Sequence, residues 1–248
     1  MRAKTILLIL LALALWSGPA AAELTVGLGV GTGTSPYRNY DRKAVPWPMI
    51  RYEGERFYIQ DLSVGLKLYD QEGLKASVFV AYDPHSFDSG DTSNSRLKRL
   101  DDRDEGVLVG GRLSYHHEVG VFSASLAGDV SGHSQGLVGR LAYSHPLDFG
   151  QFSLTPHAGV YWHSEKYNDY YYGVSRREAI RSGLPNYEAD SAFSPFVGLS
   201  AGLRLDEAGR LRVNAFGEVR ALPGEVKDSP MVGRSSTYSY GAGVAYTF

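Results

Sequence analysis

The chain has 248 residues, and its 25 Lys and Arg against 27 Asp and Glu give no basic footprint for nucleic-acid binding. It contains no cysteine, which excludes disulfides, thiolate metal sites and lipid attachment to a cysteine. The 17 Tyr and 29 Gly are numerous; Tyr suits bilayer interfaces, and Gly suits tightly packed, curved strands.

The first 22 residues have the layout of a secretory signal peptide. Arg2 and Lys4 give a charged start, an apolar run follows over residues 5–16, and three alanines end the segment at Ala22. The run is too short to cross a bilayer as a helix, and no later stretch has 18 uninterrupted apolar residues. We therefore expect residues 1–22 to be a signal peptide and residues 23–248 to form one domain.

Apolar residues alternate with small or polar ones from Leu24 onward. Side chains on a strand alternate between two faces, so each such run predicts a strand with one apolar and one polar face. Pro46 and Pro48 favour an edge or rim position for the second strand. The pattern changes phase near Gln60 and Asp61, which indicates either a bulge or a tight reversal. The expected strands are 24–32, 45–52, 57–60, 62–68, 74–82, 107–116, 122–126, 137–144, 151–163, 193–205, 211–221 and 236–248.

The last thirteen residues, 236–248, carry the clearest alternation. Tyr238, Tyr240, Val244, Tyr246 and Phe248 share one face, and the residues between them are small and mostly polar. A transmembrane strand needs about ten residues, apolar toward lipid, with aromatic residues at the interfaces. A last strand of a soluble sandwich would show the same alternation, but the signal peptide favours the membrane interpretation.

Short and long connections follow one another through the second half of the chain. Turns at 53–55, 69–73, 117–120, 146–150 and 206–209 would lie on the periplasmic side, and loops at 83–105, 164–191 and 223–234 would lie outside. This order predicts an all-β fold, a transmembrane antiparallel up-and-down β-barrel with an even number of strands. We expect about twelve strands; the alternative is ten, with residues 45–61 in a loop or plug.

Charged residues fall on the polar faces of several strands. The principal ones are Arg112, Arg140, Arg212, Glu218 and Arg220, and we expect them to face the lumen. The interior of a small barrel is usually packed with side chains, so a satisfied polar core is the favoured interpretation, and a selective pore is the alternative.

Two groups of residues are candidates for catalysis. Ser131 and His133 lie near Asp129, and His163, Ser164 and Glu165 are consecutive. Neither group has a diagnostic spacing, and no histidine pair has a metal-ligand pattern. We therefore expect a protein that is not an enzyme and that has no catalytic residue, metal or cofactor.

The most unusual stretch is a tyrosine-rich loop. Tyr170, Tyr171 and Tyr172 are followed by Arg176, Arg177 and Glu178. Tyr and Arg are favoured at protein interfaces, so these residues could bind a partner. They could equally belong to an aromatic girdle with a structured loop folded over the mouth of the barrel as a plug.

Segments distributed over the whole mature chain resemble the MltA-interacting protein family, MipA/OmpV. The most specific are Tyr170-Tyr171-Tyr172-Gly173-Val174-Ser175-Arg176 with Ala179 and Arg181-Ser182-Gly183-Leu184, and Asp228-Ser229-Pro230-Met231-Val232. The others are Tyr37, Tyr40-Asp41, Pro46 and Pro48 before Tyr52-Glu53-Gly54, Leu100-Asp101-Asp102-Arg103, and Leu126-Ala127-Gly128-Asp129.

The resemblance implies a location in the outer membrane and a role as a scaffold in peptidoglycan biogenesis. The implied partners are a membrane-bound lytic transglycosylase and a bifunctional penicillin-binding synthase. The family also includes adhesins and porin-like proteins, so a small channel or an adhesin is the alternative function. A murein scaffold needs its partners in the periplasm, whereas the expected topology puts the tyrosine-rich loop outside the cell.

Overall fold

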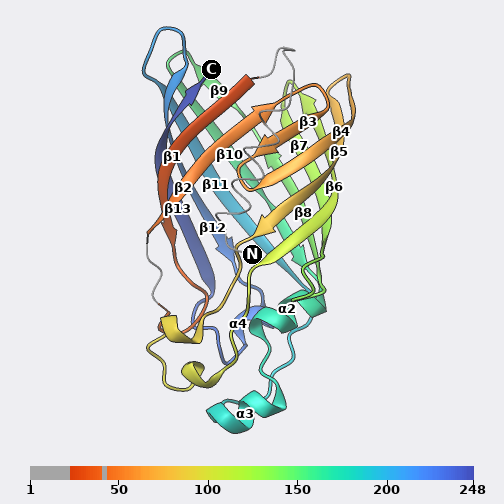
Figure 1. Cartoon of the computed structure of the whole chain (residues 1–248), viewed down its shortest axis with the longest axis vertical. Helices are drawn as coiled ribbons and strands as arrows, with labels where there is room; N and C mark the ends of the chain where they lie inside the picture. The colour runs from red at the N-terminus through yellow and green to blue at the C-terminus, as the bar shows by residue number, and fades with distance from the viewer. Residues whose placement is uncertain (1–22, 41–43) are drawn as a thin grey trace.

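The computed structural model describes residues 23–40 and 44–248, and the expected signal peptide lies outside these ranges. Within them the strands form one antiparallel sheet that closes on itself through the pairing of β10 with β11 (Figure 1). The strands are β1 (Glu23–Gly33), β2 (Val45–Glu53), β3 (Phe57–Gln60), β4 (Ser63–Gln71), β5 (Leu74–Asp83), β6 (Gly106–His117), β7 (Gly120–Asp129), β8 (Leu137–Ser144), β9 (Leu147–Phe149), β10 (Phe152–His163), β11 (Ala192–Arg204), β12 (Leu211–Ala221) and β13 (Ser236–Thr247).

The barrel has twelve strands over the described residues, because β8 and β9 together form one of them. Both pair with β10, β8 along its second half and β9 at its start, and they are separated only at His145 and Pro146. Residues 45–61 belong to the wall as β2 and β3, so the twelve-strand prediction is confirmed and the ten-strand alternative is wrong. The phase change at Gln60 is a tight reversal, with Gln60 opposite Ser63.

Within the described residues, β2 has a free edge over most of its length. β3 pairs with only three residues of β2, Arg51 to Glu53, while the rest of β2 pairs with β1 alone. Asp61 donates its backbone N–H to the Ile50 carbonyl, so even-numbered residues of β2 direct their backbone groups toward this edge. Pro46 and Pro48 are even-numbered and have no N–H to leave unpaired there, which confirms the expected edge position.

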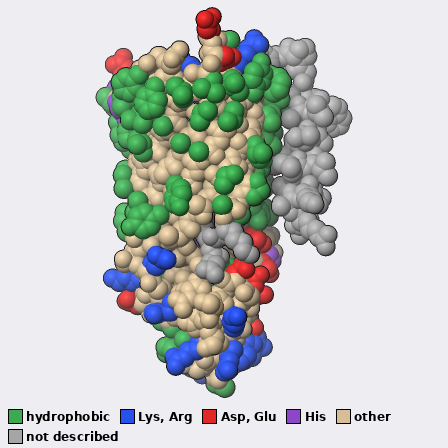
Figure 2. All heavy atoms as spheres, turned by 90° about the vertical axis from the view of Figure 1, so that its left-hand side faces the viewer, with side chains coloured by type: hydrophobic (Ala, Val, Ile, Leu, Met, Phe, Trp, Pro, Cys, Tyr) green, Lys and Arg blue, Asp and Glu red, His purple; other side chains and the backbone are tan. Residues whose placement is uncertain are grey.

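The outer wall is apolar, as the alternation predicts. Val244 on β13 is 47% exposed and Leu141 on β8 is 59% exposed, as expected of side chains that face lipid. Hydrophobic side chains cover the barrel wall in Figure 2, and Lys and Arg gather over the loops at one end. No helix among the described residues is long and apolar enough to cross a membrane.

The two ends of the barrel differ. The short turns and the C-terminus lie at one end, and the long loops, with helices α2 (Glu165–Tyr172), α3 (Arg176–Ser182) and α4 (Gly224–Lys227), lie at the other (Figure 1). The loop from β5 to β6 adds two short 3-10 helices, η1 (Ser89–Asp91) and η2 (Leu97–Arg99). In outer-membrane barrels short turns face the periplasm and long loops face outward, which assigns the helical end to the cell exterior.

Candidate functional site

The long loops at the outer end fold together into a cap with its own hydrophobic core. Tyr171 is 1% exposed, and Leu97 and Met231 are fully buried, although the three come from three different loops. The core consists of Tyr37, Phe87, Leu97, Leu100, Tyr167, Tyr171, Tyr172, Val174, Ala189, Val226, Met231 and Val232. The cap is therefore a packed unit that burial of apolar surface stabilises.

Helix α2 bridges the outer mouth of the barrel. Tyr167 donates a hydrogen bond to Asp83 Oδ2 at the end of β5, 2.8 Å away, and Tyr37, just after β1, donates to the Tyr171 carbonyl at 3.2 Å. In the closed sheet β1 and β5 each lie four strands from β10, the strand that leads into α2, on opposite sides. Contacts to strands so far apart place α2 across the opening.

Helix α3 begins with a capping box. The Ser175 hydroxyl accepts a hydrogen bond from the Glu178 backbone N–H, and the Glu178 carboxylate accepts one from the Ser175 backbone N–H at 3.0 Å. The helix ends at Gly183, whose φ of +73° is the left-handed conformation that glycine adopts without strain. The segment Ser-Arg-Arg-Glu thus carries a local signal for the start of a helix.

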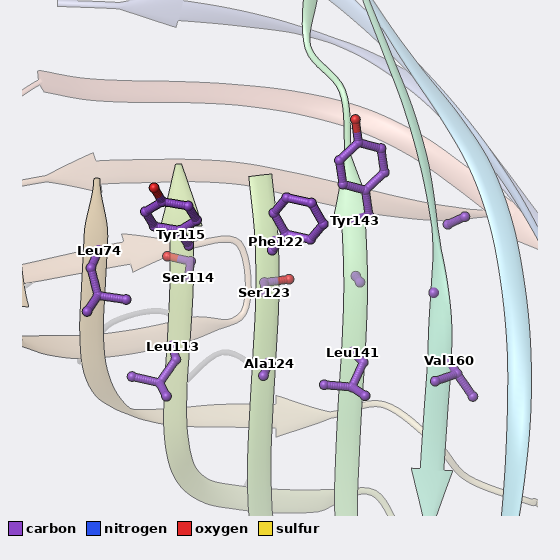
Figure 3. Close-up of a pocket in the computed structure, with 13 residues that line it drawn as sticks. Leu74, Leu113, Ser114, Tyr115, Phe122, Ser123, Ala124, Leu141, Tyr143 and Val160 are labelled. Carbon is purple, nitrogen blue, oxygen red and sulfur yellow. The ribbon is translucent and has the colours of Figure 1, made fainter. Parts of the chain in front are cut away.

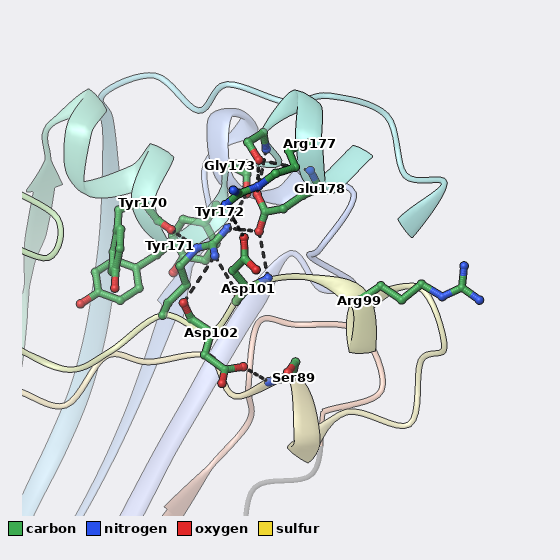
Figure 4. A network of polar contacts seen from close by, with 12 residues as sticks. Ser89, Arg99, Asp101, Asp102, Tyr170, Tyr171, Tyr172, Gly173, Arg177 and Glu178 are labelled. Atoms are coloured by element: carbon green, nitrogen blue, oxygen red, sulfur yellow. Dashed lines mark hydrogen bonds and ion pairs between the residues drawn. The ribbon is translucent and has the colours of Figure 1, made fainter. Parts of the chain in front are cut away.

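A buried ion pair connects α3 to the loop between β5 and β6. Arg103 Nη2 lies 2.8 Å from Glu178 Oε1, and their side chains are 10% and 3% exposed. The Arg103 guanidinium also donates to the backbone carbonyls of Tyr170 and Asp101 (Figure 4). Burial alone would raise the pKa of Glu178, but hydrogen bonds from Ser175 and from Arg103 outweigh it and lower that pKa to about 2.

The structure divides the predicted partner or plug residues into two groups. Tyr171, Tyr172 and Glu178 are buried in the cap, and Tyr170 is half-buried with its hydroxyl accepting from the Asp104 backbone N–H. Arg176 and Arg177 are exposed on the first turn of α3. The buried group is placed to hold the cap together, and only the arginines could meet a partner from outside.

Four of the five predicted lumen charges lie along the inside of the barrel wall. Arg220 Nη2 is 3.3 Å from Glu218 Oε1, and Glu218 Oε2 is 3.7 Å from His157 Nε2. Arg112 lies over the Phe79 ring and Arg140 over the Phe196 ring, at 4.9 Å and 5.0 Å from the ring centroids. The fifth, Arg212, donates to the Gly209 carbonyl in the periplasmic turn after β11.

Neither group of catalytic candidates assembles a nucleophile with a base. The Ser131 hydroxyl donates directly to Asp129, while His133 Nδ1 lies 2.7 Å from the Glu105 carbonyl oxygen. The Ser164 hydroxyl accepts from the Leu137 backbone N–H, and the ring of His163 stacks on Tyr167. Among the described residues there is also no cluster of three or more His, Cys, Asp or Glu that could hold a metal ion.

The periplasmic end carries a polar hollow between neighbouring turns. Its volume is about 560 Å³, and its lining includes Glu72, His116, His117, Glu118 and His145. His145 Nδ1 lies 2.8 Å from the Val119 carbonyl oxygen, which connects the turn after β6 to the end of β8. Sequence reasoning did not single out these residues, because they come from three separate turns that strand pairing places side by side.

An apolar groove marks the lipid-facing wall near the same end (Figure 3). The rings of Tyr115, Phe122 and Tyr143 lie side by side in it, on three adjacent strands. Each is at least 36% exposed, as expected of an aromatic girdle at the membrane interface. We assign this groove to contact with lipid.

Comparison with known proteins identifies the family. Residues 26–248 match the model described as MltA-interacting protein MipA. The chain belongs to the MipA family. The putative outer membrane protein YiaT of Escherichia coli K12 is 36% identical to it over 240 residues, which cover 96% of each chain. The MltA-interacting protein of the same organism is 37% identical over 215 residues, which cover 86% of this chain and 85% of that one.

This MipA-family chain is an outer-membrane β-barrel: its relatives are named outer membrane proteins, and its strands form a closed sheet. OmpV of Vibrio cholerae is 26% identical over 199 residues, covering 79% of this chain and 76% of OmpV. Among solved structures, the translocator domain of the autotransporter NalP from Neisseria meningitidis aligns with a TM-score of 0.48 and 12% identity, covering 99% of this chain and 95% of that one. No catalytic role accompanies the family assignment.

Proposed function

We propose that this MipA-family protein is a non-enzymatic scaffold that brings together peptidoglycan-remodelling enzymes. The partners would be a membrane-bound lytic transglycosylase and a bifunctional penicillin-binding synthase. The observation that carries the proposal is the 37% identity to a protein named for its interaction with MltA, over 86% of the chain. The packed cap over the outer mouth adds support, because a wide open pore would leave that mouth clear.

The periplasmic turns are the surface that we propose for partner binding. Murein enzymes lie on the periplasmic side, and the tyrosine-rich segment lies at the opposite end of the barrel, where it would serve as a plug. The hollow lined by Glu72, His117, Glu118 and His145 offers polar and charged groups at the periplasmic end. Such groups suit a transient contact, which is more polar than an obligate interface.

The test is a pull-down from detergent-solubilised envelopes with the tagged mature protein, followed by mass spectrometry. We expect enrichment of a lytic transglycosylase and a penicillin-binding protein. Enrichment should fall in a His117→Ala/Glu118→Gln variant and persist in Arg177→Ala, which changes the exposed cap instead. A clean preparation without murein enzymes would refute the scaffold and favour a small channel or an adhesin, which conductance in planar bilayers would then separate.

A further inference from the structure

The inner wall carries a group of arginines that its carboxylates do not neutralise. Arg112, Arg140 and Arg220 line the lumen, where Glu218 pairs with Arg220 and faces His157, and where Asp83 at the end of β5 also interacts electrostatically with Arg220. Within residues 23–40 and 44–248, the hydrogen-bond acceptor of Arg112 is the Gln60 side chain, at 3.4 Å, and its guanidinium also lies over the Phe79 ring. Among the described residues Arg140 has neither a carboxylate nor a hydrogen-bond acceptor, and its one type of contact is with aromatic rings.

Sheet register brings these residues together. Arg112, Ser125, Arg140 and Tyr161 lie opposite one another on four successive barrel strands, and Phe196 lies opposite Arg220. Their neighbours in sequence on the outer face include Leu113 and Leu141, 54% and 59% exposed, so the arginines point inward. The alternation of each strand thus forces the positive charges into the lumen.

Two of the guanidinium groups contact the same aromatic ring. The Arg220 guanidinium carbon lies 4.0 Å from the Tyr161 centroid, and that of Arg140 lies 5.6 Å from the same centroid. The Phe196 ring packs 4.9 Å from Tyr161 and is itself 5.0 Å from the Arg140 guanidinium carbon. Cation–π contacts use the faces of both guanidinium groups. The in-plane donors of Arg140 have no acceptor among the described residues, whereas Arg220 Nη2 donates to Glu218.

The Arg220 guanidinium is partly accessible from the lumen. The Arg220 side chain is 32% exposed although it faces the interior, and its Nε is buried without a hydrogen-bond acceptor in the protein. A guanidinium presents a rigid fork of donors that matches a carboxylate or a phosphate. A guanidinium N–H that has no acceptor in a partly desolvated wall costs free energy, and a bound oxyanion would supply an acceptor for the accessible donors.

We propose that Arg140 and Arg220, which both contact the Tyr161 ring, form a binding site for a small oxyanion in the lumen of the barrel. The oxyanion would be a carboxylate or a phosphate. The site is separate from the periplasmic hollow, so it stands or falls independently of the scaffold function. It also differs from a satisfied polar core, in which every arginine would have an acceptor within the protein.

The first test is arginine footprinting of the mature protein in detergent with phenylglyoxal, mapped by mass spectrometry. Phosphate or benzoate is added at about 50 mM, because we expect weak binding with a dissociation constant on that order. Either anion should slow modification of Arg140 and Arg220 but not of Arg177 on the cap. If only phosphate or only benzoate protects the arginines, that anion is the preferred ligand. Equal rates with and without both anions would overturn the proposal, and so would an Arg140 that the reagent never reaches.

The second test is calorimetric titration with the same anions. We expect Arg140→Met, which keeps the apolar stem against Phe196, to weaken binding by about tenfold or more, since a hydrogen bond to a charged group contributes on that order. Arg177→Met, with the same change in net charge on the outside, should bind as the native protein does. Equal affinity of the two variants would also overturn the site. The footprint needs no variant, so a misfolded Arg140→Met leaves the first test decisive.

Discussion

Replacing Glu178 with alanine removes one partner of the buried pair that connects α3 to the loop between β5 and β6. The variant leaves the Arg103 guanidinium, 10% exposed, without its carboxylate. Breaking a buried ion pair in this way costs about 3–5 kcal/mol, and loss of the capping box with Ser175 adds on the order of 1 kcal/mol. The barrel wall makes no use of this pair, so we expect the cap to open while the barrel stays folded.

Hydrogen exchange of the α3 backbone amides measures this opening. A cost of about 3–5 kcal/mol corresponds to roughly 10²–10⁴-fold faster exchange in the cap, with strand amides unchanged. The control is Arg177→Ala, because the Arg177 side chain is 83% exposed and its 3.5 Å pair with Asp101 is worth at most about 1 kcal/mol. If both variants exchange alike, the pair does not hold the cap and this reasoning fails.

Acid offers a second route to the same opening. The pKa of Glu178 is lowered from an ordinary value of 4.5 to about 2 in the folded cap. A lowered pKa means that the carboxylate stabilises the cap above pH 4.5 and that this contribution is lost as the pH falls toward 2. We expect α3 exchange to accelerate across that window, and Glu178→Gln to flatten the acceleration; an unchanged pH profile in the variant would contradict the assignment.

Two further predictions concern the barrel wall. Leu199→Lys, on the outer face in the middle of β11, should destabilise the barrel in lipid by about 2–4 kcal/mol, whereas Ser200→Lys, one residue on and facing the lumen, should cost less; equal costs in denaturant unfolding would reverse the facing assignment. Gly65→Ala should destabilise by about 1–3 kcal/mol, because a Cβ there would lie 2.3 Å from Tyr58 Cζ. The cost should largely disappear in a Tyr58→Leu background, and a persistent cost would mean that the backbone of β4 resists the change.

The barrel could be predicted from the sequence because its signals are local. Alternation in residues 236–248 depends only on the two faces of a strand, and the structure exposes Tyr240 and Val244 on the face that the pattern indicates. The even strand count followed from the lengths of the connections. Even the prolines of β2 could be interpreted locally, since a missing N–H is tolerated at an edge but would remove a hydrogen bond from a central ladder.

The cap could not be predicted in the same way, because its contacts join residues far apart in sequence. Arg103 and Glu178 are 75 residues apart, and nothing near either one indicates the other. The sequence did contain one usable signal: Ser175 and Glu178 have the spacing of a capping box, and Gly183 follows at the helix end. Residues 164–191 were expected to be a loop, whereas the structure forms α2 and α3 there.

Charge placement in the lumen shows where local reasoning ends. Alternation predicts that Arg140 and Arg220 face inward, but it cannot tell a paired arginine from an unpaired one. Arg220 reaches Glu218, which lies two residues away on its own strand. Sheet register, in contrast, places Arg140 opposite Ser125 and Tyr161, which carry no charge. Strand alternation keeps the Arg140 side chain away from lipid, but among the described residues no acceptor meets its guanidinium. The two proposals place an oxyanion inside the barrel and a protein partner at the periplasmic turns, on residues that can be varied separately.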